Sequence, residues 1–136
     1  MTEDINKKLM QEAEKAKENA YVPYSKFAVG AALITESGDV YTGCNVESAS
    51  YGATNCAERT AIFKAVSDGH RKIKKIAIIS DLDETYPCGI CRQVIAEFSD
   101  NVEIIIGNAD SYKILFLDDL FPYSFTKKDL ESIERK

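Results

Sequence analysis

The first stretch of the chain places apolar residues at helical spacing among lysines and glutamates. The apolar positions are Ile5, Leu9, Ala13, Ala16 and Ala20. Residues three and four apart share one face of a helix, so the pattern predicts an amphipathic helix from Thr2 to about Ala20. Pro23 is expected to stop this helix, because proline cannot continue it.

Two apolar runs that follow are expected to form a β-hairpin. The first runs from about Phe27 to Thr35 and the second from Val40 to Asn45, with Glu-Ser-Gly-Asp between them. A glycine in a short polar segment between two apolar runs is typical of a tight turn.

Helical and extended patterns then alternate along the chain. One helix is predicted from about Cys56 to Ser67, ended by Gly69, and another from near Cys88 to Phe98. Apolar strands are predicted at Ile76–Ile79 and Val102–Ile106. The first of them is apolar on both faces, which is typical of a central strand covered by helices. The order of strand, helix and strand predicts a parallel pair with a right-handed crossover.

The last part of the chain predicts two further elements. Ile114 to Leu117 reads as a strand, and Thr126 to Arg135 as a helix with Thr126 as N-cap and Asp129 three residues later. The whole order predicts an α/β fold, a three-layer αβα sandwich with a mixed five-stranded sheet. A chain of 136 residues has the size of one ordinary domain, so a single domain over residues 1–136 is expected.

Composition and charge narrow the class of protein. Apolar residues make up 45% of the chain, and no apolar run approaches the roughly 18 residues that a membrane span needs. The N-terminus lacks the basic-then-apolar order of a secretory signal, so a cytoplasmic location is expected. The net charge of −5 argues against a nucleic acid polymer as partner, and the basic cluster His70–Lys75 is interpreted as a solvated loop.

Four cysteines carry the candidate chemistry. In the cytoplasm thiols stay reduced, so metal ligands or core thiols are expected rather than disulfides. Cys56 stands two residues before Glu58, while Cys88 and Cys91 are three apart, a spacing that puts two thiols on one face of a helical turn or knuckle. Three thiols leave one of the usual zinc positions for water or substrate, as in catalytic sites, and Glu58 is the candidate acid.

Cys56 and Cys88 both fall at predicted helix N-termini. Unpaired backbone N–H groups and the helix dipole there favour negative charge and lower the pKa of a thiol. Three thiolates leave a Zn²⁺ site with net negative charge, which makes bound water less acidic than in a neutral three-histidine site. Compensating positive charge is therefore expected, and the helix ends supply part of it.

The motifs resemble those of the small homotetrameric zinc-dependent cytidine deaminases, which act on free nucleosides. The zinc-deaminase signature is His or Cys, any residue and Glu, followed later by Pro-Cys-x-x-Cys. The resemblance runs from about residue 20 to 98 through Tyr24-Ser25-Lys26-Phe27, Val29-Gly30-Ala31-Ala32-Leu33, Gly43-Cys44-Asn45-Val46-Glu47, Cys56-Ala57-Glu58-Arg59-Thr60-Ala61 and Pro87-Cys88-Gly89-Ile90-Cys91-Arg92-Gln93.

This resemblance implies a hydrolase of cyclic amidine C–N bonds that converts cytidine and deoxycytidine to uridine and deoxyuridine, as in pyrimidine salvage. Cys56, Cys88 and Cys91 would hold one Zn²⁺ per chain, and zinc-bound hydroxide would attack C4 of the base. Glu58 would act as the proton shuttle, to the ring nitrogen N3 and then to the departing amine. Arg59 matches an arginine that hydrogen-bonds ligand sulfurs in similar three-cysteine deaminases, and would tune the charge of the site.

The resemblance also implies the substrate contacts. Phe27 matches the phenylalanine that packs against the pyrimidine ring, and Ala57 a residue that gives backbone hydrogen bonds to the base. Asn45 and Glu47 match the pair that hydrogen-bonds the ribose hydroxyls. These types suit the task, because an aromatic face stacks on a base while an amide and a carboxylate bind hydroxyl groups.

Two further positions imply an oligomer. Tyr51 and Phe125 match residues that reach into a neighbouring subunit's site, so a homotetramer with composite active sites is expected. Beyond residue 99 the resemblance is carried only by Phe121-Pro122 and Ser124-Phe125.

Some residues depart from the family pattern. Ser48 stands where asparagine is usual, Ile90 where alanine is common, and residues 81–86 form an acidic approach to the cysteine pair. Ser48 is expected to affect loop geometry, Ile90 to narrow the pocket near the metal, and the acidic run to affect its rim.

Three alternatives stay open. The first is a deaminase of a modified cytosine nucleoside such as blasticidin S, which would share the fold and the chemistry. The second is a non-catalytic structural-zinc module with Cys44 as fourth ligand, although Cys44 is interpreted as a core thiol and His70 as no ligand. The third is a thiol redox protein that uses Cys88 and Cys91.

Overall fold

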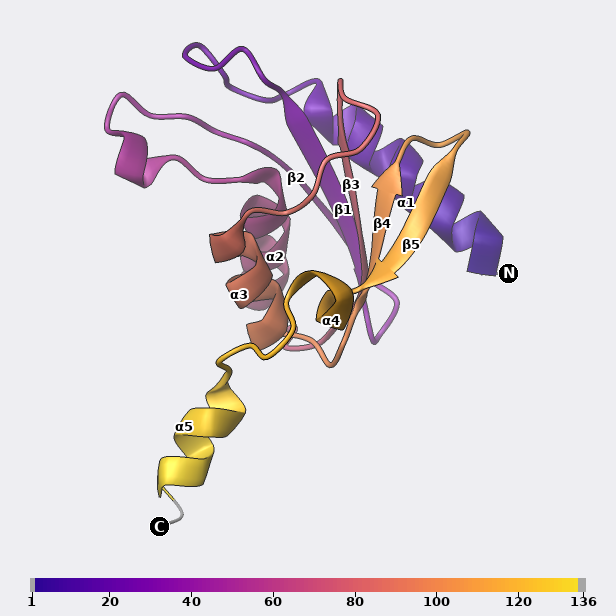
Figure 1. Ribbon diagram of the computed structural model, residues 1–136. Coiled ribbons are helices and arrows are strands. Elements are labelled where there is room, and N and C mark those ends of the chain that lie inside the picture. Colours follow the sequence, from indigo (N-terminus) through magenta and orange to yellow (C-terminus); the bar gives the residue numbers. More distant parts are fainter. Residues whose placement is uncertain (1, 135–136) are drawn as a thin grey trace.

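The computed structural model describes the backbone of residues 2–134 and shows helices packed on both faces of one sheet (Figure 1). The strands are β1 (Val29–Thr35), β2 (Val40–Cys44), β3 (Ile73–Ser80), β4 (Glu103–Gly107) and β5 (Tyr112–Phe116). The helices are α1 (Thr2–Lys17), the 3-10 turn η1 (Tyr51–Ala53), α2 (Ala57–Ser67), α3 (Gly89–Glu97), α4 (Leu117–Leu120) and α5 (Lys127–Glu134).

The five strands form a mixed sheet in the order β2-β1-β3-β4-β5. The predicted hairpin is confirmed: β1 and β2 are antiparallel, and Gly38 in their turn has a φ of 93°, a conformation that favours glycine. The central strand β3 pairs antiparallel with β1 and parallel with β4, as the alternation of strands and helices predicted. β5 closes the sheet antiparallel to β4.

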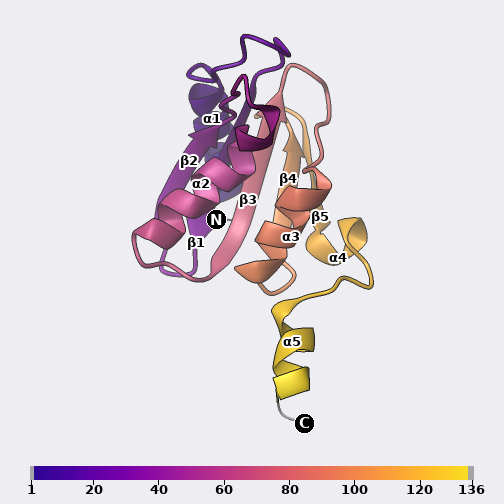
Figure 2. The same cartoon turned by 90° about the vertical axis from the view of Figure 1, so that its left-hand side faces the viewer.

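Three layers result, with α1 on one face of the sheet and α2 and α3 side by side on the other (Figure 2). Each face has its own apolar cluster. Ala31 and Leu33 of β1 pack towards α2, whereas Ala32 between them packs with Leu9 and Met10 of α1, because successive strand residues point to opposite faces. The predicted three-layer αβα sandwich is therefore confirmed.

Several element boundaries differ from those predicted. α1 ends at Lys17, well before Pro23, because the chain turns through i→i−3 hydrogen bonds and Tyr21 then pairs with Val46. Leu117, predicted to end the last strand, instead begins the short helix α4 and is buried. Sequence periodicity missed both α4 and η1, since each is about one helical turn long and carries no repeat.

The last helix, α5, projects away from the sheet and its covering helices (Figure 1). Thr126 lies just before it as predicted, and its Oγ1 accepts a hydrogen bond from Lys128 N at 3.3 Å while Asp129 Oδ2 accepts one from Thr126 N at 2.8 Å. The predicted end at Arg135 lies outside the described residues.

None of the helices in the described part of the chain could cross a bilayer. The longest, α1, has 16 residues and carries charged side chains throughout. A membrane-spanning helix needs about 20 mostly apolar residues.

Candidate metal centre and active site

Three of the four cysteine sulfurs converge at the start of the two helices that cover one face of the sheet. Cys56 is the N-cap residue of α2 and Cys88 that of α3, and Cys91 lies buried in the first turn of α3. The three Sγ atoms lie within 4.8 Å of one another, and those of Cys56 and Cys88 are 3.8 Å apart. The chain brings together residues 32 positions apart because α2 and α3 begin side by side.

The fourth thiol, Cys44, is not part of this group. It ends β2 and pairs with Gly30, whose missing side chain would meet α1, whereas its neighbour Gly43 faces α2. Adjacent residues of a strand point to opposite faces, so Cys44 lies on the α1 side of the sheet. Three sulfurs, rather than four, are thus available to a metal ion at this place.

Arg59 lies in the first turn of α2 and contacts the sulfur of Cys56 directly. Its Nη2 donates to Cys56 Sγ at 3.3 Å, and its buried Nε has no hydrogen-bond partner among the described residues. A hydrogen bond from Cys91 is the largest cause that lowers the pKa of Cys56 to about 5, and the hydrogen bond from Arg59 acts in the same direction. The hydrogen bond to Cys56 and burial raise the pKa of Cys91. Cys56 therefore becomes a thiolate more readily than Cys91.

The donor set suits a thiophilic dication. Sulfurs less than 5 Å apart lie at the spacing that a tetrahedral Zn²⁺ site with Zn–S bonds of about 2.3 Å requires. A dication would remove the competition between the three thiols for protons, and Arg59 would offset the resulting net negative charge. Cys56, Cys88 and Cys91 are therefore the residues that fit zinc.

Glu58 lies between Cys56 and Arg59 in sequence and points into the protein. Its side chain is 4% exposed, and burial is the main cause that raises its pKa to about 7. The negative charge of Cys56 raises it further, and Arg59 opposes this effect. A carboxyl group with a pKa near neutrality can both accept and return a proton, as an acid–base catalyst must.

A second layer of contacts, which sequence reasoning missed, holds these groups in place. Thr60 Oγ1 donates to the Cys56 carbonyl at 3.2 Å and accepts from Asn55 Nδ2 at 3.1 Å. Arg92 donates from Nε to the carbonyl of Pro87 at 2.8 Å and from Nη1 to that of Leu120 at 2.6 Å. The loop before Cys88 is thereby tied to the C-terminal part of the chain.

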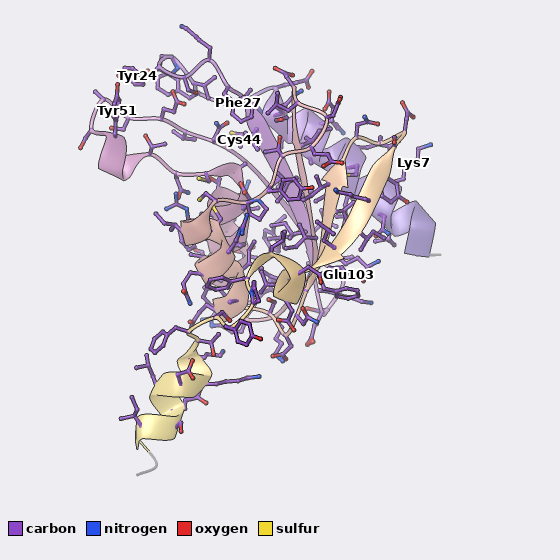
Figure 3. The ribbon with its side chains drawn as sticks, viewed as in Figure 1. Lys7, Tyr24, Phe27, Cys44, Tyr51 and Glu103 are labelled. Atoms are coloured by element: carbon purple, nitrogen blue, oxygen red, sulfur yellow. The ribbon has the colours of Figure 1, made fainter. Side chains whose placement is uncertain are left out.

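Three of the residues expected to contact the nucleoside, Phe27, Asn45 and Glu47, lie in two adjacent segments. Phe27 precedes β1 and is partly buried against the core, and Asn45 follows β2 directly (Figure 3). Asn45 Nδ2 donates to the Phe27 carbonyl at 2.8 Å, and Glu47 accepts hydrogen bonds at 3.1 Å from the backbone N–H groups of Tyr24 and Ser25. These side chains therefore organise one polar and aromatic region.

Tyr51 and Phe125 are both exposed, and Tyr51 borders this region, since it lines one cavity with Ser25 and Glu47. Their exposed fractions are 73% and 58%, and Tyr51 stacks edge-on against Tyr24 at 5.9 Å between ring centroids (Figure 3). Phe125 is held by its carbonyl, which accepts from Gln93 Nε2 at 2.7 Å. Ala57, by contrast, is fully buried at the start of α2.

The residues that depart from the family pattern are also placed. Ile90 is 62% exposed, so its side chain projects outward from the start of α3. Ser48 N donates to Thr54 Oγ1 at 3.1 Å and thus closes the loop that contains η1. In the acidic run, Asp81 pairs with Lys17 at 2.7 Å and Glu84 with Lys113 at 3.1 Å.

His70, the one histidine of the sequence, follows α2 and lies at the β1–β2 turn. Its ring nitrogens face Ser37 and Asp39, each at 3.3 Å. It is not a member of the sulfur cluster.

The fold and this site together define a zinc-dependent deaminase domain, and comparison with known proteins agrees. A family model described as the cytidine and deoxycytidylate deaminase zinc-binding region matches residues 3–107. A cytidine deaminase from Sporosarcina psychrophila is 51% identical over 126 aligned positions, and the alignment covers 90% of this chain and 93% of that protein. The chain belongs to the cytidine and deoxycytidylate deaminase family.

Two further relatives place the chain within it. The crystal structure of a cytidine deaminase from Burkholderia pseudomallei superimposes with a TM-score of 0.82 and 44% identity, covering 87% of this chain and 97% of that one. A blasticidin-S deaminase from Bacillus cereus is 26% identical over 137 aligned positions, and the alignment covers 93% of this chain and 98% of that protein. The similarity to cytidine deaminases is therefore the stronger of the two.

Proposed function

We propose that this protein catalyses the hydrolytic deamination of cytidine and deoxycytidine, giving uridine or deoxyuridine and ammonia. The observation that carries the proposal is the buried carboxyl group of Glu58, two residues from one of three converging sulfurs. Relatives at about half identity that are named cytidine deaminases support the choice of substrate. Residues 1–136 would form a single domain of this family.

Cys56, Cys88 and Cys91 would hold the zinc ion, and Arg59 would balance their charge. A bound zinc ion supplies Lewis-acid activation of water beside the base. Glu58 accepts a proton from the attacking water and donates it to N3 of the ring. It then accepts the second proton of that water, from the hydroxyl group now on C4, and transfers it to the amine, which leaves C4 as ammonia while the C4 carbonyl forms. Burial of Glu58 keeps bulk water from competing for these protons.

Phe27, Asn45 and Glu47 position the nucleoside. Phe27 offers a ring for packing against the pyrimidine, and Asn45 and Glu47 offer amide and carboxylate groups for the sugar hydroxyls. The backbone of Ala57, at the start of α2, would bind the polar edge of the base. Asn45 and Glu47 suit the hydroxyl groups of an ordinary ribose, and this favours cytidine over a nucleoside with a modified sugar.

We propose further that four copies assemble with composite active sites. Tyr51 and Phe125 are more than half exposed, which supports a role in contacting a neighbouring copy. Such an enzyme would work in the cytoplasm, where the three thiols stay reduced.

The test is loss of cytidine absorbance on incubation with purified protein, beside deoxycytidine and blasticidin S, with zinc measured in the same sample. Turnover of both natural nucleosides with about one zinc per chain is expected. Glu58→Gln should keep zinc and fold yet lose turnover by at least about 100-fold. Turnover of blasticidin S alone would favour the modified-nucleoside alternative, whereas near-full activity of Glu58→Gln would contradict the proposed chemistry.

A further inference from the structure

The hydroxyl of Ser25 connects two residues that the proposed function assigns to the substrate. It donates a hydrogen bond to Glu47 Oε2 and accepts one from the backbone N–H of Phe27 at 3.0 Å. A serine hydroxyl has one proton to donate, and here that proton goes to the carboxylate. Ser25 therefore joins the sugar-binding candidate to the base-stacking candidate through one oxygen atom.

The peptide groups on both sides of Phe27 are fixed by side chains rather than by a regular strand. Its N–H is held by Ser25, and its carbonyl accepts from Asn45 Nδ2 at 2.8 Å. Asn45 Oδ1 also accepts from Val29 N at 2.9 Å, where β1 begins. The aromatic ring of Phe27 is thus attached to a backbone whose direction is set by Ser25 and Asn45.

The backbone before Phe27 would not keep this course by itself. Lys26 has a φ of 63°, in the left-handed region that non-glycine residues rarely adopt, and its N–H donates to the Val22 carbonyl at 3.1 Å. Such a conformation persists where surrounding contacts impose it, and these are frequent at functional sites. The contacts from Glu47 to Tyr24 and Ser25 lie directly before it.

Glu47 is itself fixed in direction by isolated β-bridges between three extended segments outside the main sheet. Val46 forms bridges with Tyr21 on one side and with Asn55 on the other. Side chains alternate along an extended segment, so Asn45 and Glu47 emerge on the same side and Val46 on the opposite one. Asn55 directly precedes Cys56, and the arrangement therefore also sets the distance from the sugar-binding pair to the sulfur cluster.

The hydrogen-bond capacity of Glu47 is nearly used before any substrate binds. It accepts from Tyr24 N, from Ser25 N and from Ser25 Oγ, and the last of these is the largest cause of a pKa below the ordinary 4.5. A carboxylate accepts about four hydrogen bonds, so room for about one more donor remains. Ser25 and Glu47 also line a cavity of about 360 Å³ together with Tyr24, Tyr51 and Thr54.

We propose that Ser25 is a positioning residue for the deamination: its hydroxyl orients the Glu47 carboxylate and fixes the Phe27 backbone, so that sugar recognition and base stacking are set together before substrate arrives. The proposal rests on the proposed function. Preorganisation of this kind lowers the cost of binding. Removal of the hydroxyl should therefore raise KM for cytidine far more than it lowers kcat.

The experiment uses the full, zinc-loaded chain and compares Ser25→Ala with Ser25→Thr. Ser25 is exposed, so the extra methyl group of threonine has space and the hydroxyl is kept. Ser25→Ala should raise KM for cytidine about tenfold, the order that loss of one hydrogen bond to a charged group produces, with kcat within about threefold. Ser25→Thr should restore KM to near the original value. Ser37→Ala, at the other end of β1, is the matched control and should leave KM unchanged.

A double-mutant cycle with Glu47→Ala separates the positioning role from a merely structural one. If Ser25 acts through Glu47, adding Ser25→Ala to Glu47→Ala raises KM by much less than it does in the original protein. Equal effects in both backgrounds, or no effect of Ser25→Ala at all, would overturn the proposal.

An NMR titration of the Glu47 carboxyl group provides a readout that does not need turnover. Ser25→Ala should move its pKa up towards 4.5, and Ser25→Thr should not. A protein that shows this shift but turns over no cytidine would refute the proposed function and keep the structural coupling. If the original protein turns over cytidine but Ser25→Ala changes neither the Glu47 pKa nor KM, the proposed function is kept and the positioning role of Ser25 is refuted.

Discussion

Replacement of Gly43 by alanine should damage the active site from behind, because this residue is the contact point between β2 and α2. A Cβ atom at Gly43 would lie 2.5 Å from Ala61 N, 2.7 Å from the Ala57 carbonyl oxygen and 2.9 Å from Thr60 Cβ. Two of these neighbours are helix backbone and cannot rotate away. To reach an ordinary contact of 3.4 Å, α2 must move by 3.4 − 2.5 = 0.9 Å.

The helix that moves carries Cys56 at its N-cap and Glu58 in its first turn. Misplacement of a reacting group by about 1 Å can cost roughly 100-fold in rate. Overpacking of this kind also costs about 1–3 kcal/mol of unfolding free energy. Gly43→Ala is therefore expected to lose about 100-fold in kcat/KM for cytidine and to melt several degrees lower, at about 4 °C per kcal/mol.

Gly30→Ala is the control, because it makes the same chemical change in the neighbouring strand on the opposite face. Its Cβ would meet the Ala13 carbonyl oxygen of α1 at 2.0 Å. Its melting temperature should fall at least as far, yet the folded protein should keep kcat/KM within about threefold, since α1 carries none of the candidate site residues. The assays are cytidine absorbance and circular dichroism, run well below the melting temperature. Equal loss of turnover in both variants, or an unchanged Gly43→Ala enzyme, would refute the reasoning.

Three further predictions concern other contacts. Arg92→Gln removes the charged donor to the carbonyls of Pro87 and Leu120 and should cost about 2 kcal/mol of unfolding free energy. In chelator competition, this variant should lose zinc at a roughly tenfold lower chelator concentration. Unchanged zinc retention would contradict this prediction. Cys44→Ser should keep about one zinc per chain and full turnover, as metal analysis and the absorbance assay would show, since Cys44 lies on the α1 side of the sheet. The hydrogen bond to Asp68 is the largest cause that raises the pKa of Tyr41 to about 12. The stabilising contribution of this hydrogen bond is therefore full below pH 10 and is lost as the pH rises through 12. Ultraviolet titration of Asp68→Asn should find that the pKa of Tyr41 has fallen towards 10.0.

The sheet and its covering helices could be predicted because their information is local. Apolar spacing in β1, β3 and α2 shows the face or faces that each element buries, and Gly38 marks the turn between two strands. The sulfur cluster was also accessible, since the spacing of Cys88 and Cys91 and the position of Cys56 before a helix are properties of the sequence.

The contacts around that cluster were not accessible in the same way. The pairing of Tyr21, Val46 and Asn55 joins three irregular segments, and single-residue bridges leave no repeat in the sequence. Arg92 resembles any helix arginine until the fold brings the carbonyls of Pro87 and Leu120 to it. Ser25 likewise became distinctive only once Glu47 and Phe27 were found at its hydroxyl.

The unequal spacing of the three sulfurs along the chain implies an order in which an ion can be captured. Cys88 and Cys91 are three residues apart and can chelate a cation while the chain is still unfolded, but Cys56 stands 32 residues before Cys88. Closure of a loop of that length costs about 3–4 kcal/mol of chain entropy at 25 °C. Packing of α2 against β2 and β1 removes that cost, because it brings Cys56 to the start of α3. The third sulfur therefore joins the ion only when the domain folds, and an ion already on the pair favours the folded chain.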